Sequence, residues 1–175
     1  MAKAGPRRRE GVKRYGNGRI VNADRGERPD KIVAVVLAQP HRRGERDHRA
    51  GFAYGRMLLG GVIDDRQYQA AEVFTKRSVR YMTHITGGMP RFPSLAAEMI
   101  GTFSGSSPDL DDEQISSIRS AYAELQDALA DAGMHYEGNS ILMRVCVMDK
   151  ELTRDEEVGA FRCALNVVAN RLRLT

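Results

Sequence analysis

Two adjacent glycines, Gly60 and Gly61, constrain the fold of this chain more than any other feature of its sequence. They follow a short apolar segment that ends at Leu59, and they precede a long segment that begins with Asp64 and Asp65. Glycine is expected where a helix ends, because it takes positive φ without steric cost. An aspartate can accept hydrogen bonds from the first N–H groups of the next helix. The sequence therefore predicts a helix, a glycine turn and a second helix at this point.

Apolar or small residues recur at alternating spacings of three and four along several segments, which is the period of one buried helix face. The stripes are Ala71, Phe74, Ser78, Tyr81 and Ile85; Ile115, Ile118, Tyr122, Leu125 and Leu129; Ile141, Leu142, Val145 and Met148; and Val158, Phe161, Leu165, Val168 and Leu172. We expect Asn139 or Ser140 to cap the third of these helices, and Thr153 to begin a capping box for the last. With the segment before Gly60, the stripes predict an all-α protein, a compact helical bundle of about five helices.

Charge is distributed unevenly along the chain, although the formal net charge is only +4. Residues 1–48 contain 13 Lys and Arg residues against 6 Asp and Glu residues, a net charge of +7, which leaves −3 for the rest of the chain. Residues 1–49 are also poor in apolar side chains, so we expect a basic, flexible N-terminal arm that is largely disordered when free. Its apolar segment 32–38 is the part that could order on the core, as a strand or a short helix. Residues 50–175 are expected to form the helical bundle domain.

Neither a membrane span nor a signal peptide is indicated. No apolar run approaches the ~20 residues that a bilayer requires, and no apolar region follows the basic N-terminus. We therefore expect no membrane association and a cytoplasmic location. The two cysteines, Cys146 and Cys163, lie in separate helical patterns with no metal-binding spacing around them. We interpret both as buried free thiols.

The sequence shows no pattern that is typical of a catalytic site. No P-loop, nucleophile elbow, zinc-protease motif or pair of catalytic carboxylates appears with the flanking structure that it needs. The acidic residues within 109–113 lack the glycine and the distal glutamate of a calcium loop, and their position suits the N-terminus of a helix. His41 and His48 have no third ligand at a fixed spacing. We predict that the protein is not an enzyme and has no cofactor and no metal site.

Basic residues in three parts of the chain are candidates for contact with nucleic acid, because Lys and Arg displace counterions from phosphate groups. They are Arg7, Arg8, Arg9, Lys13, Arg14, Arg42 and Arg43 in the arm; Lys76, Arg77 and Arg80 on the long helix; and Arg162, Arg171 and Arg173 on or beside the last helix. The arm could equally be a solvated tail, whereas for the long helix we favour a core helix with a solvated basic face over a DNA-reading element.

Residues 140–173 would also fit a terminal helix-turn-helix whose last helix enters the major groove of DNA. Groove-reading helices use Asn or Gln for adenine and Arg or Lys for guanine. Because we recognise no Asn or Gln beside the arginines of the last helix on one short face, we do not favour this arrangement.

Four segments of the chain together resemble a domain of known proteins: residues 63–74, 119–129, 142–152 and 164–169. In this order and at similar spacing, they are similar to an uncharacterised helical domain of alphaproteobacteria, over roughly residues 58–173. That domain occurs at the C-terminus of the transcriptional activator of gene transfer agents and in related phage and prophage proteins. The helix-turn-helix that precedes it in the activator has no counterpart in the arm, which is too polar to form one. The resemblance implies a phage-derived regulatory role through DNA, RNA polymerase or both.

Two non-enzymatic functions remain open. In the first, the chain is a transcriptional regulator of phage or gene-transfer-agent type that binds double-stranded DNA, with the basic arm on the phosphates. In the second, the bundle is an adaptor that binds RNA polymerase or another protein, or that self-assembles in phage DNA packaging like a small terminase subunit. A compact homo-oligomer is compatible with the sequence, whereas no heptad run is long enough for an extended coiled coil.

Overall fold

The computed structural model describes residues 38–42, 44–87 and 110–175. It divides into two units, Met1–Gly44 and Glu45–Thr175, which we describe separately. In the first unit, the described part contains one turn of 3-10 helix, η1 (Pro40–Arg42). Most of the predicted arm, residues 1–37, lies outside the described residues.

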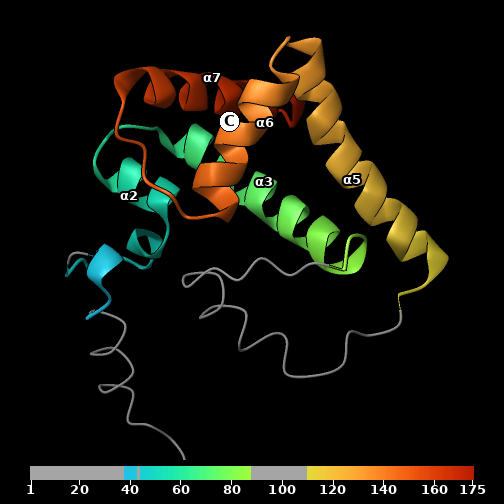
Figure 1. Ribbon diagram of the computed structural model, residues 1–175, viewed down its shortest axis with the longest axis horizontal. Coiled ribbons are helices and arrows are strands. Elements are labelled where there is room, and N and C mark those ends of the chain that lie inside the picture. The colour runs from blue at the N-terminus through green and yellow to red at the C-terminus, as the bar shows by residue number, and fades with distance from the viewer. Residues whose placement is uncertain (1–37, 43, 88–109) are drawn as a thin grey trace, which may run out of the picture. The chain divides into compact units, whose positions relative to one another are not determined.

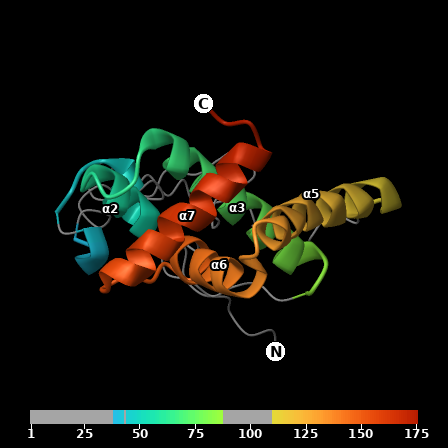
Figure 2. The same ribbon diagram turned by 90° about the horizontal axis from the view of Figure 1, so that it is seen from above.

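The second unit is all-helical in its described residues, which confirms the predicted fold class. Its elements are η2 (His48–Gly51), α2 (Ala53–Leu59), α3 (Asp65–His84), α5 (Asp112–Asp131), α6 (His135–Leu142), the π-helix η3 (Met143–Val147) and α7 (Asp155–Arg171). Helix α3 packs against α5, α7 and η3, and α6 packs against α7 and α5 (Figures 1 and 2). None of the described helices combines the length and the apolar composition that crossing a bilayer requires.

The glycine turn between α2 and α3 forms as predicted. Gly60 follows the last residue of α2, and Gly61 has a φ of +68°. Of the two candidate caps, Asp64 is the one used: its side chain accepts a hydrogen bond from the backbone N–H of Gln67 at 2.7 Å. The Gln67 side-chain oxygen accepts in return from the Asp64 N–H at 3.1 Å. This reciprocal capping box satisfies two N–H groups that a helix otherwise leaves without partners.

The core is built from the predicted stripes. Its largest fully buried apolar side chains are Phe74, Phe161, Leu125, Leu129, Leu142, Leu165, Val145, Val147 and Val168. Each of the helices α3, α5, α6 and α7 contributes to this list, because each presents one apolar face to its neighbours. The predicted stripe residue Met148 is instead 40% exposed, since it lies just beyond the end of η3.

Helix α6 begins earlier than the sequence indicated. We expected a cap at Asn139 or Ser140, but the helix starts at His135 and contains both residues. Gly138, which precedes the expected cap, is buried within the helix. A Cβ at Gly138 would lie 3.5 Å from the Ala164 Cβ and 3.2 Å from a methyl group of the Leu129 side chain. The glycine therefore allows close packing of α6 on α5 and α7, a contact that local sequence does not reveal.

Two further expectations for α7 were wrong. The residue that precedes it, Arg154, makes no side-chain capping bond, so the predicted capping box at Thr153 does not form. Three acidic residues in the first turn, Asp155 to Glu157, interact favourably with the helix dipole instead. Cys163 is exposed, whereas Cys146 is buried as expected. Cys163 lies on the solvent-facing side of α7. The periodicity of apolar residues does not show whether a residue beside the stripe is buried or exposed.

Helix α2 depends on a residue far along the chain. Asp149, which follows η3 and has a φ of +52°, accepts a hydrogen bond from the Ala53 N–H at 2.6 Å through Oδ1. Arg56 of α2 lies 3.8 Å from the same carboxylate and donates from Nε to Glu151 Oε1 at 2.8 Å. Asp149 thus takes the place of an N-cap that Phe52 cannot supply. The connection between η3 and α7 therefore holds the N-terminal end of the bundle.

Substitution of two glycines tests the packing at this end. A Cβ at Gly55 of α2 would lie 1.8 Å from the Arg49 carbonyl oxygen, so the Gly55→Ala substitution forces backbone to move. We expect it to lower the free energy of unfolding by about 1–3 kcal/mol, as overpacking does. The control is Gly159→Ala in α7, where a Cβ meets nothing within 4 Å. We expect that variant to gain roughly 0.5–1 kcal/mol from helix propensity.

Urea unfolding followed by circular dichroism gives both changes. Equal effects of the two substitutions would contradict the close approach of η2 to α2.

Candidate nucleic-acid interface

The predicted contacts in the N-terminal arm are not placed by the structure. Arg7, Arg8, Arg9, Lys13, Arg14 and Arg43 lie outside the described residues. Arg42 lies at the end of η1 and is half-buried. The role of the arm in a nucleic-acid interface therefore remains a prediction that rests on its charge.

The three basic residues predicted on α3 divide into two kinds. Lys76 and Arg80 are exposed, and they form no ion pair with another described residue. Arg77 is only 27% exposed, and its Nη1 donates to Glu124 Oε2 at 2.7 Å and to the Ala121 carbonyl oxygen at 2.9 Å. Arg77 therefore joins α3 to α5, and its charge is already partly compensated.

Arg171 at the end of α7 is directed to the same carboxylate. Its Nε lies 3.7 Å from Glu124 Oε1. Glu124 thus lies between Arg77 and Arg171, and the three side chains connect α3, α5 and α7. Charge alone predicted Arg77 and Arg171 as nucleic-acid contacts on equal terms with the other basic residues. It could not distinguish them, because their acidic partner Glu124 lies far away along the chain.

The other two predicted contacts near the C-terminus, Arg162 and Arg173, are exposed. Between them on α7 lie Asn166 and Asn170, which are exposed as well. Positions 162, 166 and 170 are spaced by four residues, so these side chains share one face of the helix. Two asparagines therefore accompany the arginines of the last helix, and the interpretation that none does was wrong. The four-residue spacing of these side chains is visible in the sequence itself.

Residues of α3 bind both asparagines through their side-chain oxygens. Gln67 Nε2 donates to Asn166 Oδ1 at 3.0 Å, and Arg66 Nη2 donates to Asn170 Oδ1 at 2.5 Å. Arg66 Nε also donates to the Leu174 carbonyl oxygen at 2.9 Å. We call these four side chains, Arg66, Gln67, Asn166 and Asn170, the α3–α7 seam. It ties two side chains of the exposed polar face of α7 to the start of α3.

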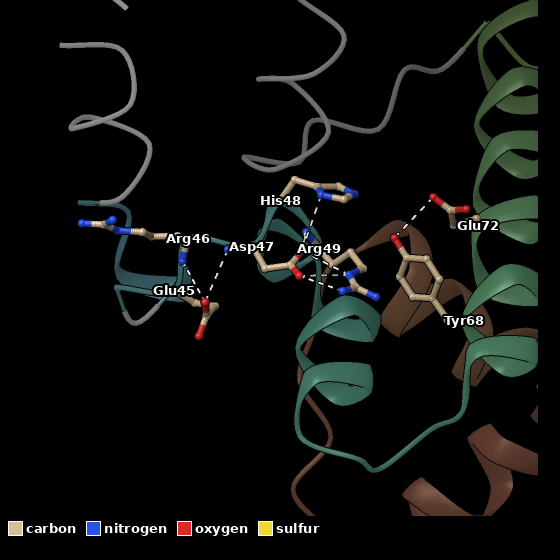
Figure 3. A network of polar contacts seen from close by, with 7 residues as sticks. All are labelled: Glu45, Arg46, Asp47, His48, Arg49, Tyr68 and Glu72. Atoms are coloured by element: carbon tan, nitrogen blue, oxygen red, sulfur yellow. Dashed lines mark hydrogen bonds and ion pairs between the residues drawn. The ribbon is translucent and has the colours of Figure 1, made fainter. Parts of the chain in front are cut away.

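A second polar cluster lies at the start of the core unit (Figure 3). Arg49 donates from Nη2 to Asp47 Oδ2 at 2.8 Å, and its backbone N–H donates to Asp47 Oδ1 at 2.9 Å. These hydrogen bonds lower the pKa of Asp47 to about 2. Tyr68 donates to Glu72 Oε1 at 3.4 Å nearby. Arg49 thus stabilises η2 through Asp47, and we interpret the cluster as structural.

A pocket of about 230 Å³ between α6 and α7 is unsuited to phosphate. Its lining includes the carboxylates of Glu137, Glu156 and Glu157 and a single guanidinium, that of Arg144. Arg144 Nη1 donates to Glu157 Oε1 at 2.9 Å, and this bond lowers the pKa of Glu157. The three carboxylates outnumber the one positive charge, so this side of the core repels an anion.

Two titratable groups are buried in the described core, the Cys146 thiol and the Tyr54 hydroxyl. Burial raises the pKa of the Cys146 thiol and that of the Tyr54 hydroxyl, so both groups stay protonated near neutral pH. Within the described part of the chain, no group of three or more His, Cys, Asp or Glu side chains is arranged to hold a metal ion. The described surface offers hydrogen-bond donors and positive charge on α3 and on the end of α7.

Removing the charge of Glu124 tests its position between the two arginines. The side chains are 27%, 38% and 47% exposed for Arg77, Glu124 and Arg171, so the pairs are partly screened by solvent. We expect Glu124→Gln to lower the free energy of unfolding by up to about 1 kcal/mol at low salt and by less at high salt. Asp127→Asn, at an exposed position on the same helix, is the matched control for charge. Equal losses in both variants, or a loss that salt leaves unchanged, would count against the three-residue arrangement.

No family model, no curated protein and no solved structure matches the chain. The resemblance to the alphaproteobacterial domain therefore stays a prediction from the sequence.

Proposed function

We propose that the protein is a non-catalytic, DNA-binding regulator of phage or gene-transfer-agent type. The observation that carries the proposal is the separation of charge between the two units. Residues 1–44 contain 12 Lys and Arg residues against 4 Asp and Glu residues, a net charge of +8. Residues 45–175 contain 15 against 19, a net charge of −4.

Such a separation suits a polyanionic partner that engages only part of the molecule. Lys and Arg side chains gain affinity for DNA by releasing counterions from its phosphates, and they need no fold to do so. The acidic core surfaces, such as the pocket lined by Glu137, Glu156 and Glu157, repel the same phosphates. DNA is then held by the arm and meets the core only where positive charge is exposed. Such places include Lys76 and Arg80 on α3, and Arg162 and Arg173 near the C-terminus.

The regulatory part of the proposal comes from the sequence resemblance. It includes RNA polymerase, or another host or phage protein, as a second partner for the core. A packaging subunit that assembles into a ring is the alternative. Light scattering on the full chain separates the two, because a ring-sized mass supports packaging and a monomer or dimer supports a regulator.

Fluorescence anisotropy with a labelled DNA duplex tests the role of the arm. We expect Arg7→Ala, Arg8→Ala and Arg9→Ala, combined in the full chain, to weaken binding and to reduce the salt slope of log K by about 3. The matched control removes three exposed charges from the core, with Arg119→Ala, Lys150→Ala and Arg154→Ala. Both triple variants change the net charge equally.

A difference between them therefore reports position, beyond the effect of total charge. An absence of binding by the unaltered protein at about 50 mM salt would end the proposal. Equal losses in the two triple variants would remove the arm from it.

A further inference from the structure

We propose that the C-terminal half of α7 reads base edges in the major groove of DNA. Asn166 and Asn170 would be the reading side chains, and Arg162 and Arg173 would flank them. This inference rests on the DNA binding proposed above and adds sequence recognition to it. It assigns a DNA contact to the core, although the net charge of the core is negative.

The first support is the way α7 is exposed. Arg162, Asn166 and Asn170 lie one helical turn apart and are all exposed. The opposite side of the same helix carries Phe161, Ala164 and Val168, which are fully buried. A helix that is held by its apolar side and shows a continuous polar side can enter a groove without unfolding.

The second support is that the two asparagine side chains are held in place. Asn166 Oδ1 accepts from Gln67 Nε2, and Asn170 Oδ1 accepts from Arg66 Nη2. Each amide oxygen keeps a second lone pair, and neither side-chain NH₂ group donates to a described residue. An acceptor and a donor on each asparagine thus remain for the N6 and N7 atoms of adenine, its preferred base.

Because Gln67 is only 3% exposed, the seam also limits rotation of Asn166 before any ligand arrives. A side chain that is already fixed loses less conformational entropy on binding, which favours specific contact.

The dimensions of a helix and a groove agree with this arrangement. An α-helix with its side chains is about 10–12 Å wide, and the major groove is about 12 Å wide. Four residues advance the helix by about 6 Å, close to the spacing of two base pairs at ~3.4 Å each. Asn166 and Asn170 therefore lie at a separation that allows contact with bases two steps apart.

Charge limits the contact to one end of α7. Asp155 and Glu156 in the first turn of α7 are exposed and repel phosphate, and so do the exposed Asp64 and Asp65 at the start of α3. Arg162 and Arg173 attract it. Within the seam, Arg66 donates from Nε and Nη2, which leaves Nη1 to donate to a phosphate group. The DNA backbone would accordingly run beside residues 162–173.

The competing explanation is that the α3–α7 seam only holds two helices together. It predicts that loss of either asparagine lowers stability and leaves DNA recognition unchanged. The two explanations therefore differ in sequence preference, which a structural contact does not affect.

The experiment is selection of bound sequences from a randomised duplex library by the full chain. We expect an enriched motif that contains adenine. Asn166→Ala and Asn170→Ala should each reduce the preference for the motif over random duplex by about 5-fold to 150-fold, the range for one good base contact. Affinity for random duplex and its salt slope should not change, because both depend on phosphate contacts.

The chain offers a matched control on another helix. Asn139 on α6 accepts from Gln126 Nε2 at 3.1 Å through Oδ1, which is the same kind of bond as the one between Asn166 and Gln67. Asn139→Ala should change stability without changing sequence preference. Arg162→Ala provides a second variant that keeps the seam intact, and it should weaken preference at a neighbouring guanine.

The outcomes separate this inference from the proposed function. An enriched motif that weakens in the Asn166, Asn170 and Arg162 variants and persists in Asn139→Ala supports both. DNA binding with no enriched sequence, or with a motif that all the variants retain, overturns the inference and leaves the proposed function standing. No binding at low salt overturns both.

Discussion

The buried side-chain amide of Gln67 is the contact on which the arrangement of the bundle depends. Its oxygen closes the capping box with Asp64, and its nitrogen donates to Asn166 on α7. An unpaired amide buried to this degree would cost about 1–3 kcal/mol, so both bonds favour a single placement of α3 relative to α7. Further along α3, the Thr75 hydroxyl donates to the Ala71 carbonyl oxygen at 2.7 Å and lies 3.3 Å from the Cys146 carbonyl oxygen of η3. Arg77 binds α5. Helix α3 therefore has side-chain contacts with α5, α7 and η3.

The same arrangement determines which charges remain available. Arg77 and Arg171 are drawn to Glu124, and Arg49 is drawn to Asp47. These pairs stabilise the core and reduce the positive charge that it can offer to an anionic partner. Of the exposed cations that remain on the described core, those at the end of α7 lie beside two fixed asparagines. In the proposed DNA-binding function, the weakly charged but ordered face on the core would serve discrimination and the strongly charged arm would serve affinity.

Sequence patterns predicted the structural features that depend on residues close together in the chain. The apolar stripes located the core faces of α3, α5 and α7, and the turn at Gly61 followed from local chemistry. Features that arise from distant contacts escaped prediction, among them the cap that Asp149 supplies to α2, the early start of α6 around Gly138 and the pairing of Arg77 with α5. In the candidate site, the arginines were found by charge alone. The asparagines of α7 are candidates for base contact because α3 side chains hold them in place. The linear sequence does not show those contacts.

The central claim is that α7 and the arm contact DNA together, and NMR titration of the isotope-labelled full chain with a duplex tests it most directly. The account predicts that the side-chain amide signals of Asn166 and Asn170 shift together with backbone signals of residues 162–173 and of the arm. The Asn139 amide, on α6, should stay unchanged. Shifts confined to the arm, or centred on α5 and α6, would contradict the account.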